Sequence, residues 1–555
     1  MKQKQRSFFQ MNDERFRQMM VFLIVTVALF TSLVLLIQNE AGMRTNVFRR
    51  DANRYAVQAM RVRSTGETRA GYAWNVAYQS WLEMGLLASA AEKAGDPSAA
   101  ERYRNVQEQI ARHSPLLEKK YFGEKQNEPH IEAYEADSYL VEATALSERA
   151  ATWFVVGEVW DGKADANITY LSLLAVALAL YGLAAALAAR VRWIFMMSGS
   201  LIFLVTSYFT IETFLKPVPV ISEPAIDAYA RGVGSAYRGD VAGAIKAFDE
   251  ALAAKNDYAN AYYDRGYAFY KQGALDKAIE NYEAAKKNGR DDTAVNFDLG
   301  WAYYLQGNFE NAIKANQRAL EFNANHAGAR MNLALAQLAA GKADDARKEY
   351  AAAMDSAAKQ VADAQAAGKA PPASLWVALD DGASDLESLF ARAQNRDTEG
   401  TAVPPREMIK DANAITRAAP DLIKQLKNLE LALEYTSRPP SGTTRAKIGA
   451  LKFGVSDGRA VKFADQFPTE TKAIVVAFDY SEMENGKTMI VRVYQDGEED
   501  SSLRLVSKWE VGASGKTEIE IGAGYSGVFS FPPGEYLVEV YVDYQWVQSG
   551  SFVVQ

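Results

Sequence analysis

Residue types that commonly carry chemistry are few in this chain of 555 residues, and none falls in a catalytic spacing. The chain has no cysteine, which excludes disulfides, thiolate metal ligands and a cysteine nucleophile. His113, His130 and His326 share no helical spacing, so we interpret them as surface or packing residues. The glycines of residues 522–527 open no helix, which favours a loop over a phosphate-binding site. We therefore expect no enzymatic activity, no cofactor and no metal.

Two acidic clusters, Asp380–Asp381 and residues 498–500, are the remaining candidates for a metal site. Neither has the ligand ladder of a calcium-binding loop, so we expect solvated turns, with a Ca²⁺ site as the alternative. The net charge is −8 and the pI is about 5.4, so the chain lacks the basic footprint of a nucleic-acid-binding protein.

A 34-residue period organises residues 225–358. Small residues align at this period in four columns: Gly232, Gly266, Gly300 and Ala334; Gly239, Gly273, Gly307 and Gly341; Ala244, Ala278, Ala312 and Ala346; Ala251, Ala285, Ala319 and Ala353. The stretch resembles the tetratricopeptide repeat family, most clearly over residues 299–320, which implies two helices per repeat stacked into an α-solenoid. The first column would let helices approach closely, and the second would end a helix with φ > 0. Asn316 stands where the other copies have an aromatic residue, which predicts a looser joint after the third repeat.

In that family the first helix of each repeat lines the concave face, and here those positions are rich in aromatic residues. They are Tyr229, Val233, Tyr237, Tyr263, Tyr267, Tyr270, Phe297, Trp301, Tyr304, Met331, Leu335 and Leu338. An exposed aromatic groove predicts a site for partner proteins or peptides. The alternative is that later helices of the same chain fill it. Tyr229 and Tyr263 stand where a carboxylate clamp would need lysines, which argues against a receptor for acidic C-terminal peptides.

Three apolar stretches predict an integral membrane protein. Residues 20–38 follow a basic segment at 1–19 and carry no charge, which is enough helix to span about 28 Å. We favour an uncleaved anchor over a signal peptide. Residues 168–189 and 193–215 form a predicted transmembrane hairpin around Arg190 and Arg192.

Residues 39–167 between the first two spans are predicted to form an antiparallel bundle of three helices, at about 71–96, 98–113 and 130–160. Basic residues near the spans are equally numerous on both sides, so the short turn at Arg190 decides the orientation and places residues 1–19 in the cytoplasm. Residues 20–215 resemble an uncharacterised family of bacterial three-span membrane proteins, through residues 49–60, 168–184 and 190–193. That resemblance implies a helical extracytoplasmic insert, with the bulk of the chain outside the cytoplasm.

The segments that flank the repeats differ in character. Residues 216–224 are proline-rich and are expected to hold the solenoid a short way off the membrane. Residues 359–436 contain helical stretches at about 373–394 and 405–435 that could cap the solenoid, and residues 437–445 form a predicted linker.

Residues 446–555 have the alternating pattern of an antiparallel β-sandwich of about seven to nine strands. The expected strand runs are 472–480, 488–495, 502–511, 516–522 and 535–555. The segment resembles a β-sandwich module found at the C-termini of exported bacterial proteins, through residues 478–498 and 531–554. That module is usually a binding or accessory domain, which also implies export.

The predicted fold class is therefore multidomain: a transmembrane helical region with a helical insert, an α-solenoid and a C-terminal all-β sandwich. The first functional hypothesis is a scaffold in the cytoplasmic membrane that holds partner proteins outside the cytoplasm. The second is a structural subunit of a self-associating envelope complex, because small residues at 183–189 and 198–200 would allow close helix packing. The third is a sensor or an enzyme accessory subunit whose 39–167 bundle binds a small ligand.

Overall fold

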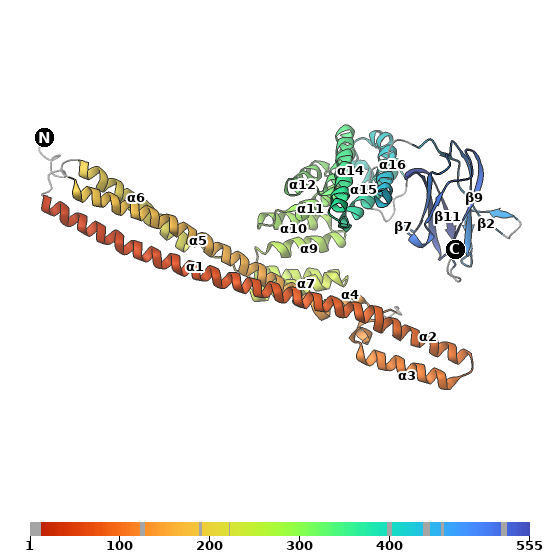
Figure 1. The fold of residues 1–555 in the computed structure, drawn as a ribbon, viewed down its shortest axis with the longest axis horizontal. Helices are drawn as coiled ribbons and strands as arrows, with labels where there is room; N and C mark the ends of the chain where they lie inside the picture. The colour runs from red at the N-terminus through yellow and green to blue at the C-terminus, as the bar shows by residue number, and fades with distance from the viewer. Residues whose placement is uncertain are drawn as a thin grey trace. The chain divides into compact units, whose positions relative to one another are not determined.

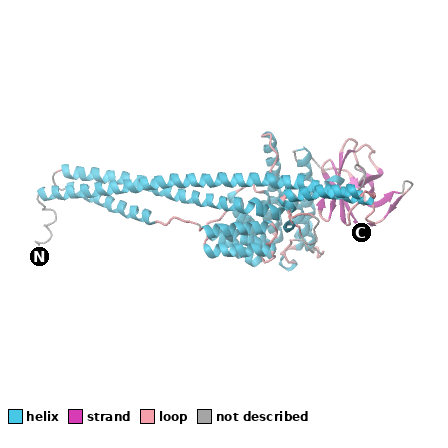
Figure 2. Cartoon of the chain, turned by 90° about the horizontal axis from the view of Figure 1, so that it is seen from below, coloured by secondary structure: helices cyan, strands magenta, loops and turns pink. Residues whose placement is uncertain are grey.

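The computed structural model describes residues 13–122, 128–187, 191–220, 222–396, 402–436, 444–456, 460–522 and 530–555. The chain divides into two compact units, Met1–Gln272 and Gly273–Gln555, and each is described by itself. Helices make up the first unit and the beginning of the second, and the strands belong to the C-terminal part (Figures 1 and 2).

Two long antiparallel helices form the backbone of the first unit. Helix α1 (Asp13–Tyr72) continues through a π-helical turn, η1 (Ala73–Tyr78), into α2 (Gln79–Lys93). Helix α5 (Val141–Ala186) lies beside α1, and α6 (Val191–Leu215) folds back on α5 (Figure 1). Three described helical segments are long and apolar enough to cross a membrane, and they contain the predicted spans; residues 188–190 lie outside the described residues.

The predicted three-helix bundle is wrong. Helix α1 continues without a break beyond the first predicted span and α5 runs unbroken into the second, so these two helices form the part of the insert next to the apolar stretches. Small residues buried along α1, among them Ala41, Ala52 and Ala59, let α5 approach closely. Helix α3 (Pro97–His113) folds back on α2 as a separate hairpin. Short elements then return the chain to α5: η2 (Pro115–Leu117), η3 (Lys119–Tyr121), α4 (Ile131–Glu135) and the π-helical η4 (Ala136–Leu140).

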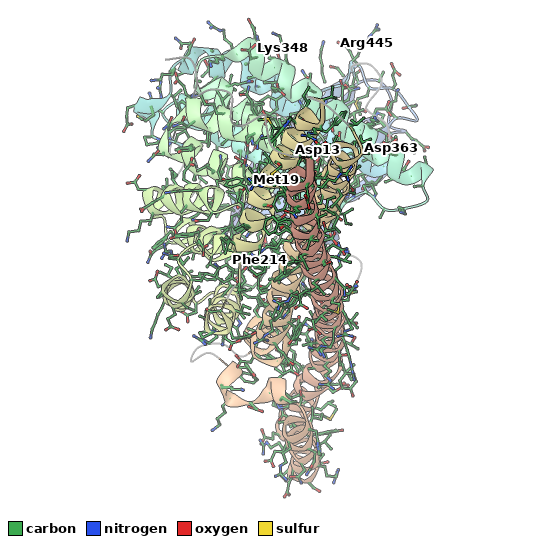
Figure 3. The ribbon with its side chains drawn as sticks, turned by 90° about the vertical axis from the view of Figure 1, so that its left-hand side faces the viewer. Asp13, Met19, Phe214, Lys348, Asp363 and Arg445 are labelled. Atoms are coloured by element: carbon green, nitrogen blue, oxygen red, sulfur yellow. The ribbon has the colours of Figure 1, made fainter. Side chains whose placement is uncertain are left out.

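The three apolar segments pack around a shared core that includes Val27, Leu174 and Tyr181. A Cβ at Gly199 would lie 3.1 Å from the Tyr181 ring, and the Ser200 hydroxyl is 3.0 Å from that of Tyr181. The small residues of 198–200 therefore serve packing within the chain. Figure 3 looks along these helices from the end of α1 that carries Asp13 and Met19.

Eight helices span the repeat region, two for each predicted repeat. The first unit holds α7 (Glu223–Tyr237), α8 (Val241–Ala254) and α9 (Ala259–Lys271). The second holds α10 (Leu275–Lys287), α11 (Thr293–Gln306), α12 (Phe309–Phe322), α13 (Ala327–Ala339) and α14 (Ala343–Ala366). His326 caps α13 by accepting a hydrogen bond from Ala329 N, and His130 caps α4 in the same way.

The glycine columns have the predicted roles. Gly239, Gly273, Gly307 and Gly341 all have φ between +79° and +81°. A Cβ at Gly300 would lie 2.4 Å from the Asn316 amide nitrogen, which shows the close approach of α11 and α12. Asn316 is fully buried and donates to Ala312 O, while its Oδ1 has no partner among the described residues. The defect at this position is therefore an unpaired buried oxygen.

The first repeat is docked on the helical insert. Arg149 of α5 forms ion pairs with Glu223 at 2.8 Å and Asp227 at 2.9 Å, and Ile226 and Ala145 share a buried cluster. The expectation that the proline-rich segment holds the solenoid a short way off the membrane stays a prediction, and α7 docks on α5 well before the second predicted span; residue 221 lies outside the described residues. An amphipathic α7 buries its apolar side against α5 because the exposed stripe of a single repeat is unfavourable in water.

In the second unit, α15 (Ala373–Ala393) and α16 (Ala412–Thr436) follow the last repeat, with a 3₁₀ turn at Arg406–Met408 between them. Helix α15 packs on α13, and α16 packs on α14 and α15. A common apolar core joins these helices to the last repeats.

The C-terminal region is the predicted all-β sandwich of two sheets. In one sheet, β5 (Ala473–Ser481) pairs with β9 (Gly515–Gly522), β1 (Lys447–Ile448) and β2 (Lys452–Ser456), and β3 (Val461–Phe463) pairs with β2. The strands of the other sheet have the order β4 (Gln466–Phe467), β11 (Gln545–Val554), β10 (Gly534–Val542) and β6 (Thr488–Gln495). Two short strands, β7 (Glu498–Glu499) and β8 (Leu505–Lys508), both pair with β6. Only β4 and β11 pair in parallel among these strands.

Two features of the strands differ from the sequence expectation. The run 535–555 is a hairpin, since Asp543 and Tyr544 both have positive φ, 53° and 65°, and turn the chain. The short strands β1 to β4 lack an alternating pattern long enough to predict. Phe478, Val491, Val538 and Phe552 lie in the core of the sandwich.

Candidate partner-binding face of the repeats

The predicted groove residues of α7 are partly withdrawn from solvent. Tyr229 is buried against Phe248 and Tyr258, and its hydroxyl donates to Asp264 at 2.5 Å. Burial raises the pKa of Tyr229 well above its ordinary value. Val233 is half-buried against the same cluster. Tyr229 and Val233 therefore stabilise the first repeat.

Among the predicted groove residues of the first unit, the accessible aromatic side chains lie on α9 and at the end of α7. Tyr263, Tyr267 and Tyr270 lie on one helical face, and Tyr267 is 40% exposed while the other two are half-buried. The Tyr267 and Tyr270 rings are 6.1 Å apart, and Lys271 Nζ lies 5.4 Å from the centre of the Tyr267 ring. On α7, Tyr237 is 46% exposed and its hydroxyl donates to Glu135 of the insert. Of these four tyrosines, Tyr267 and Tyr237 expose the most surface to a partner.

Helix α11 presents a mixed face in the second unit. Phe297 is half-buried, with its ring 5.1 Å from His326. Trp301 is half-buried and stacks on Tyr304 at 5.1 Å, while Tyr304 is only 1% exposed. Burial lowers the pKa of His326, which favours the neutral imidazole that caps α13.

Helix α15 of this chain covers the predicted groove on α13. Met331, Leu335 and Leu338 are buried, and a Cβ at Gly382 of α15 would lie 2.3 Å from the Met331 sulfur. The alternative of a self-filled groove therefore holds here, and Tyr304, Met331 and Leu335 are not accessible in this structure. The leucines of α15, including Leu379, supply an apolar stripe that is complementary to α13. Gly382 beside Ala383 is the sequence signal for this close contact.

The same helix, α15, carries a half-buried acidic side chain, Asp385, that sequence reasoning missed. Burial, and secondarily the charge of Asp381, raises the pKa of Asp385 to about 7. The hydroxyls of Tyr304 and Tyr350 are buried without a hydrogen-bond partner among the described residues, and the charge of Asp385 raises the pKa of both tyrosines further, after the larger effect of burial. Asp380 and Asp381 lie within α15, so the predicted turn at this cluster is wrong.

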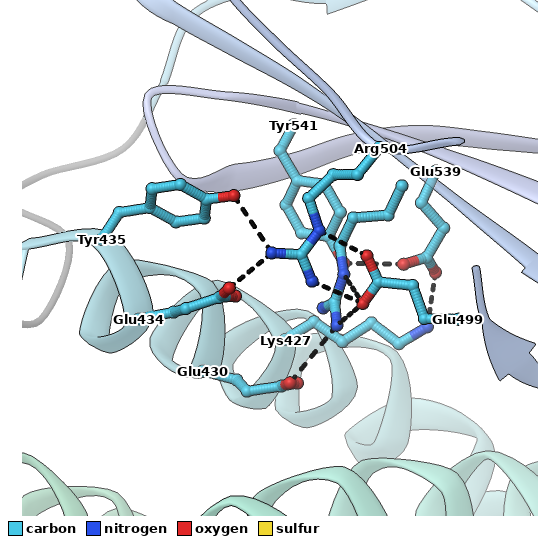
Figure 4. A network of polar contacts seen from close by, with 9 residues as sticks. Lys427, Glu430, Glu434, Tyr435, Glu499, Arg504, Glu539 and Tyr541 are labelled. Carbon is cyan, nitrogen blue, oxygen red and sulfur yellow. Dashed lines mark hydrogen bonds and ion pairs between the residues drawn. The ribbon is translucent and has the colours of Figure 1, made fainter. Parts of the chain in front are cut away.

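A second group that the sequence did not reveal joins α16 to the outer face of the sandwich (Figure 4). Lys427 Nζ lies 2.5 Å from Glu539 Oε1 and 2.7 Å from Glu387 Oε1. The Tyr541 hydroxyl donates to Glu539 at 2.7 Å. The sandwich is therefore docked on α16 through buried charge; residues 437–443 of the predicted linker lie outside the described residues.

Two arginines complete this group. Glu499 accepts from Arg492 at 2.5 Å and from Arg504 at 2.6 Å, and Arg504 also contacts Tyr435 and Glu434 of α16. Burial acts to raise the pKa of Glu499, but the hydrogen bonds from the two guanidinium groups outweigh it and lower that pKa. Glu499 is thus an ion-paired residue rather than part of a solvated turn. Within the described ranges, no group of three or more acidic or histidine side chains is arranged to hold a metal ion.

Comparison with known proteins identifies the repeats. Residues 229–293, 275–327 and 297–362 match the family described as tetratricopeptide repeat. No curated protein is similar enough in sequence to match the chain.

Similar solved structures include YrrB, a TPR protein with an unusual peptide-binding site, at 20% identity over 29% of this chain and 85% of that one, with a TM-score of 0.23. MamA protein has 19% identity over 39% of this chain and 96% of its own, with a TM-score of 0.25. The alkylpurine DNA glycosylase AlkC of Pseudomonas fluorescens has 14% identity over 60% and 91%, with a TM-score of 0.23. The family match and the succession of eight helices together show that residues 229–362 are tetratricopeptide repeats.

Proposed function

We propose that this chain is a membrane-anchored scaffold that binds partner proteins or peptides outside the cytoplasm, and that it acts by binding rather than catalysis. The observation that most supports this proposal is the aromatic face of α9, on which Tyr267 is 40% exposed beside Tyr270 and Lys271. Tyrosine rings offer a large contact area at a low entropy cost, and tetratricopeptide repeats generally mediate contacts between proteins. Because α15 covers α13, the proposed site excludes Met331 and Leu335.

Membrane anchoring is supported by the outward side chains of the apolar helices. Phe22 and Leu29 on α1 are each 68% exposed, and Leu204 on α6 is 65% exposed. Such a surface is unfavourable in water and suits lipid chains. Arg192 Nη1 is 2.7 Å from Asp13 Oδ1, so the start of α6 and the start of α1 lie together, as two membrane crossings between them would require.

Reporter fusions after Gln38, Arg192 and Ser222 test this topology. We expect an extracytoplasmic signal after Gln38 and Ser222 and a cytoplasmic signal after Arg192. A cytoplasmic signal after Ser222 would contradict the proposed location of the repeats.

A photocrosslinking amino acid in place of Tyr267 tests the binding face in cells. We expect a discrete crosslinked protein from position 267 and none from position 322, because Phe322 is a similarly exposed aromatic residue, at 45%, on the second helix of a repeat. The Tyr267→Ala, Tyr270→Ala variant should lose the crosslinked protein in co-purification, and Phe322→Ala should retain it. Retention of every partner by the tyrosine variant would refute the assignment.

A further inference from the structure

A cavity of about 530 Å³ lies between α1 and the elements that lead into α5. Helix α1 contributes Arg61, Thr65 and Arg69, α4 contributes Tyr134, and η4 contributes Ser138 and Tyr139. Its volume is in the range of pockets that hold small organic ligands. No part of the proposed binding face on α9 lines it.

The wall of this cavity is shaped by a close contact. A Cβ at Gly66 would lie 2.2 Å from Cγ of Tyr139, so only glycine lets this ring rest on the backbone of α1. Tyr139 lies in the π-helical turn Ala136–Leu140, a local irregularity that often occurs at functional sites. Burial raises the pKa of Tyr139 to about 12, so its hydroxyl keeps its proton at neutral pH. The wall is thus an ordered ring with a polar tip.

The electrostatic character of the cavity comes from α1. Arg61, Thr65 and Arg69 are spaced by four residues and therefore share one helical face. Neither Arg61 nor Arg69 forms an ion pair with another described residue, whereas Arg63 pairs with Glu67 at 2.9 Å. Glu142 is the acidic residue among the lining side chains, so two guanidinium groups face one carboxylate. Such a lining favours an anion, and guanidinium groups match the geometry of carboxylate and phosphate.

The distance of the cavity from the first predicted span, measured along α1, favours a soluble ligand over a lipid headgroup. Arg61 comes 23 residues after Gln38, the end of the first predicted span, which at 1.5 Å per residue places it about 35 Å along the helix. That distance lies beyond the headgroup layer.

We propose that this cavity binds a small soluble organic anion, a carboxylate or phosphate monoester with an aromatic or apolar body. Arg61 and Arg69 hold the anionic group, with Thr65 and Ser138 as further hydrogen-bonding groups. The body packs against Tyr134 and Tyr139. This site is distinct from the proposed partner-binding face, so either proposal can fail alone.

Calorimetric titration of the full chain in nanodiscs of zwitterionic lipid tests the proposal. The probes are phenyl phosphate and benzoate, with benzyl alcohol as the uncharged comparison. We expect saturable binding of at least one anion and none of benzyl alcohol. Arg61→Gln with Arg69→Gln should weaken anion binding by at least about tenfold, because two charge-assisted contacts are lost. Arg63→Gln, two residues from Arg61 and already paired, should leave it unchanged.

Several outcomes would overturn the proposal: no binding of either anion, equal binding of benzyl alcohol, or equal losses in the Arg63→Gln and double variants. Nanodiscs that contain anionic lipid form the second arm. Competition by that lipid would identify a headgroup site and refute a soluble ligand. Arg61 and Arg69 are exposed, so the variants should fold, and circular dichroism checks this. The single variants Arg61→Gln and Arg69→Gln give the same readout should the double variant lose helicity.

Discussion

Replacing Lys427 with methionine should loosen the β-sandwich from α16, because it removes the cation that balances Glu539. The Lys427 side chain is 15% exposed and that of Glu539 is 2% exposed, with 2.5 Å between Nζ and Oε1. Methionine has a similar length, so we expect little cavity formation. Glu387, the other partner of Lys427, is 45% exposed and can return to water.

The stability lost in the Lys427→Met variant depends on whether the Glu539 carboxylate stays charged without its partner. Removing one partner of a buried ion pair costs about 3–5 kcal/mol. An unpaired carboxylate can instead be neutralised, and for a free glutamate with a reference pKa of about 4.3 this costs about 3.7 kcal/mol at pH 7 and about 1 kcal/mol at pH 5. The Tyr541 hydroxyl still donates to Glu539, so we expect the Lys427→Met substitution to reduce the stability of the contact between the sandwich and α16 by about 3 kcal/mol at pH 7. The loss should shrink toward pH 5.

At alkaline pH the stability of the wild-type contact depends on the pKa of Lys427. Burial acts to lower the pKa of Lys427, but the carboxylates of Glu539 and Glu387 outweigh it and raise that pKa above the ordinary value. A raised lysine pKa gives stability that is complete below about pH 10.4 and is lost as the pH rises through the folded-state value. The wild-type contact should therefore persist throughout neutral pH.

Hydrogen exchange of the full chain measures this effect at β10 and β11. A loss of about 3 kcal/mol in local opening corresponds to roughly 100-fold faster exchange. Arg417→Met on the exposed side of α16 is the control and should change exchange by less than about threefold. Adding Glu539→Gln to Lys427→Met should restore most of the protection. Equal exchange in the Lys427 and Arg417 variants, or no restoration by the second substitution, would refute the reasoning.

Two further predictions concern buried polar groups in the second unit. The pKa of Asp385 is raised in the folded state, so the wild type loses stability as the pH rises from about 4 to about 7. We therefore expect Asp385→Asn to protect the amides of α15 from hydrogen exchange at pH 7.5 but not at pH 5. A gain that is equal at both pH values would contradict this assignment. Asn316→Leu should stabilise α12 by about 1 kcal/mol, because it removes a buried oxygen that lacks a partner; slower exchange of α12 amides is the readout, and faster exchange would show that the amide is needed for packing.

Local physics explains which features could be predicted from the sequence. The 34-residue period, the positive φ at Gly239 and its equivalents, and the apolar stretches all depend on residues close together in the chain. The alternating runs of the C-terminal region likewise reflect the two faces of each strand. Their element types are confirmed.

The candidate site was less predictable because contacts between distant segments decide accessibility. The twelve predicted groove positions lie on the first helix of their repeats, yet Tyr267 is exposed, while Met331 lies beneath α15 and Tyr229 donates to Asp264. Similarly, Arg149 reaches Glu223, and Lys427 reaches Glu539, across long stretches of sequence. Periodicity specifies which face of a helix is apolar, but the partner of that face is set by the three-dimensional packing of the whole unit. The sequence by itself determined the helical pairs, the apolar helices and the strands, and only the tertiary structure decided which apolar faces and charges each of them buries.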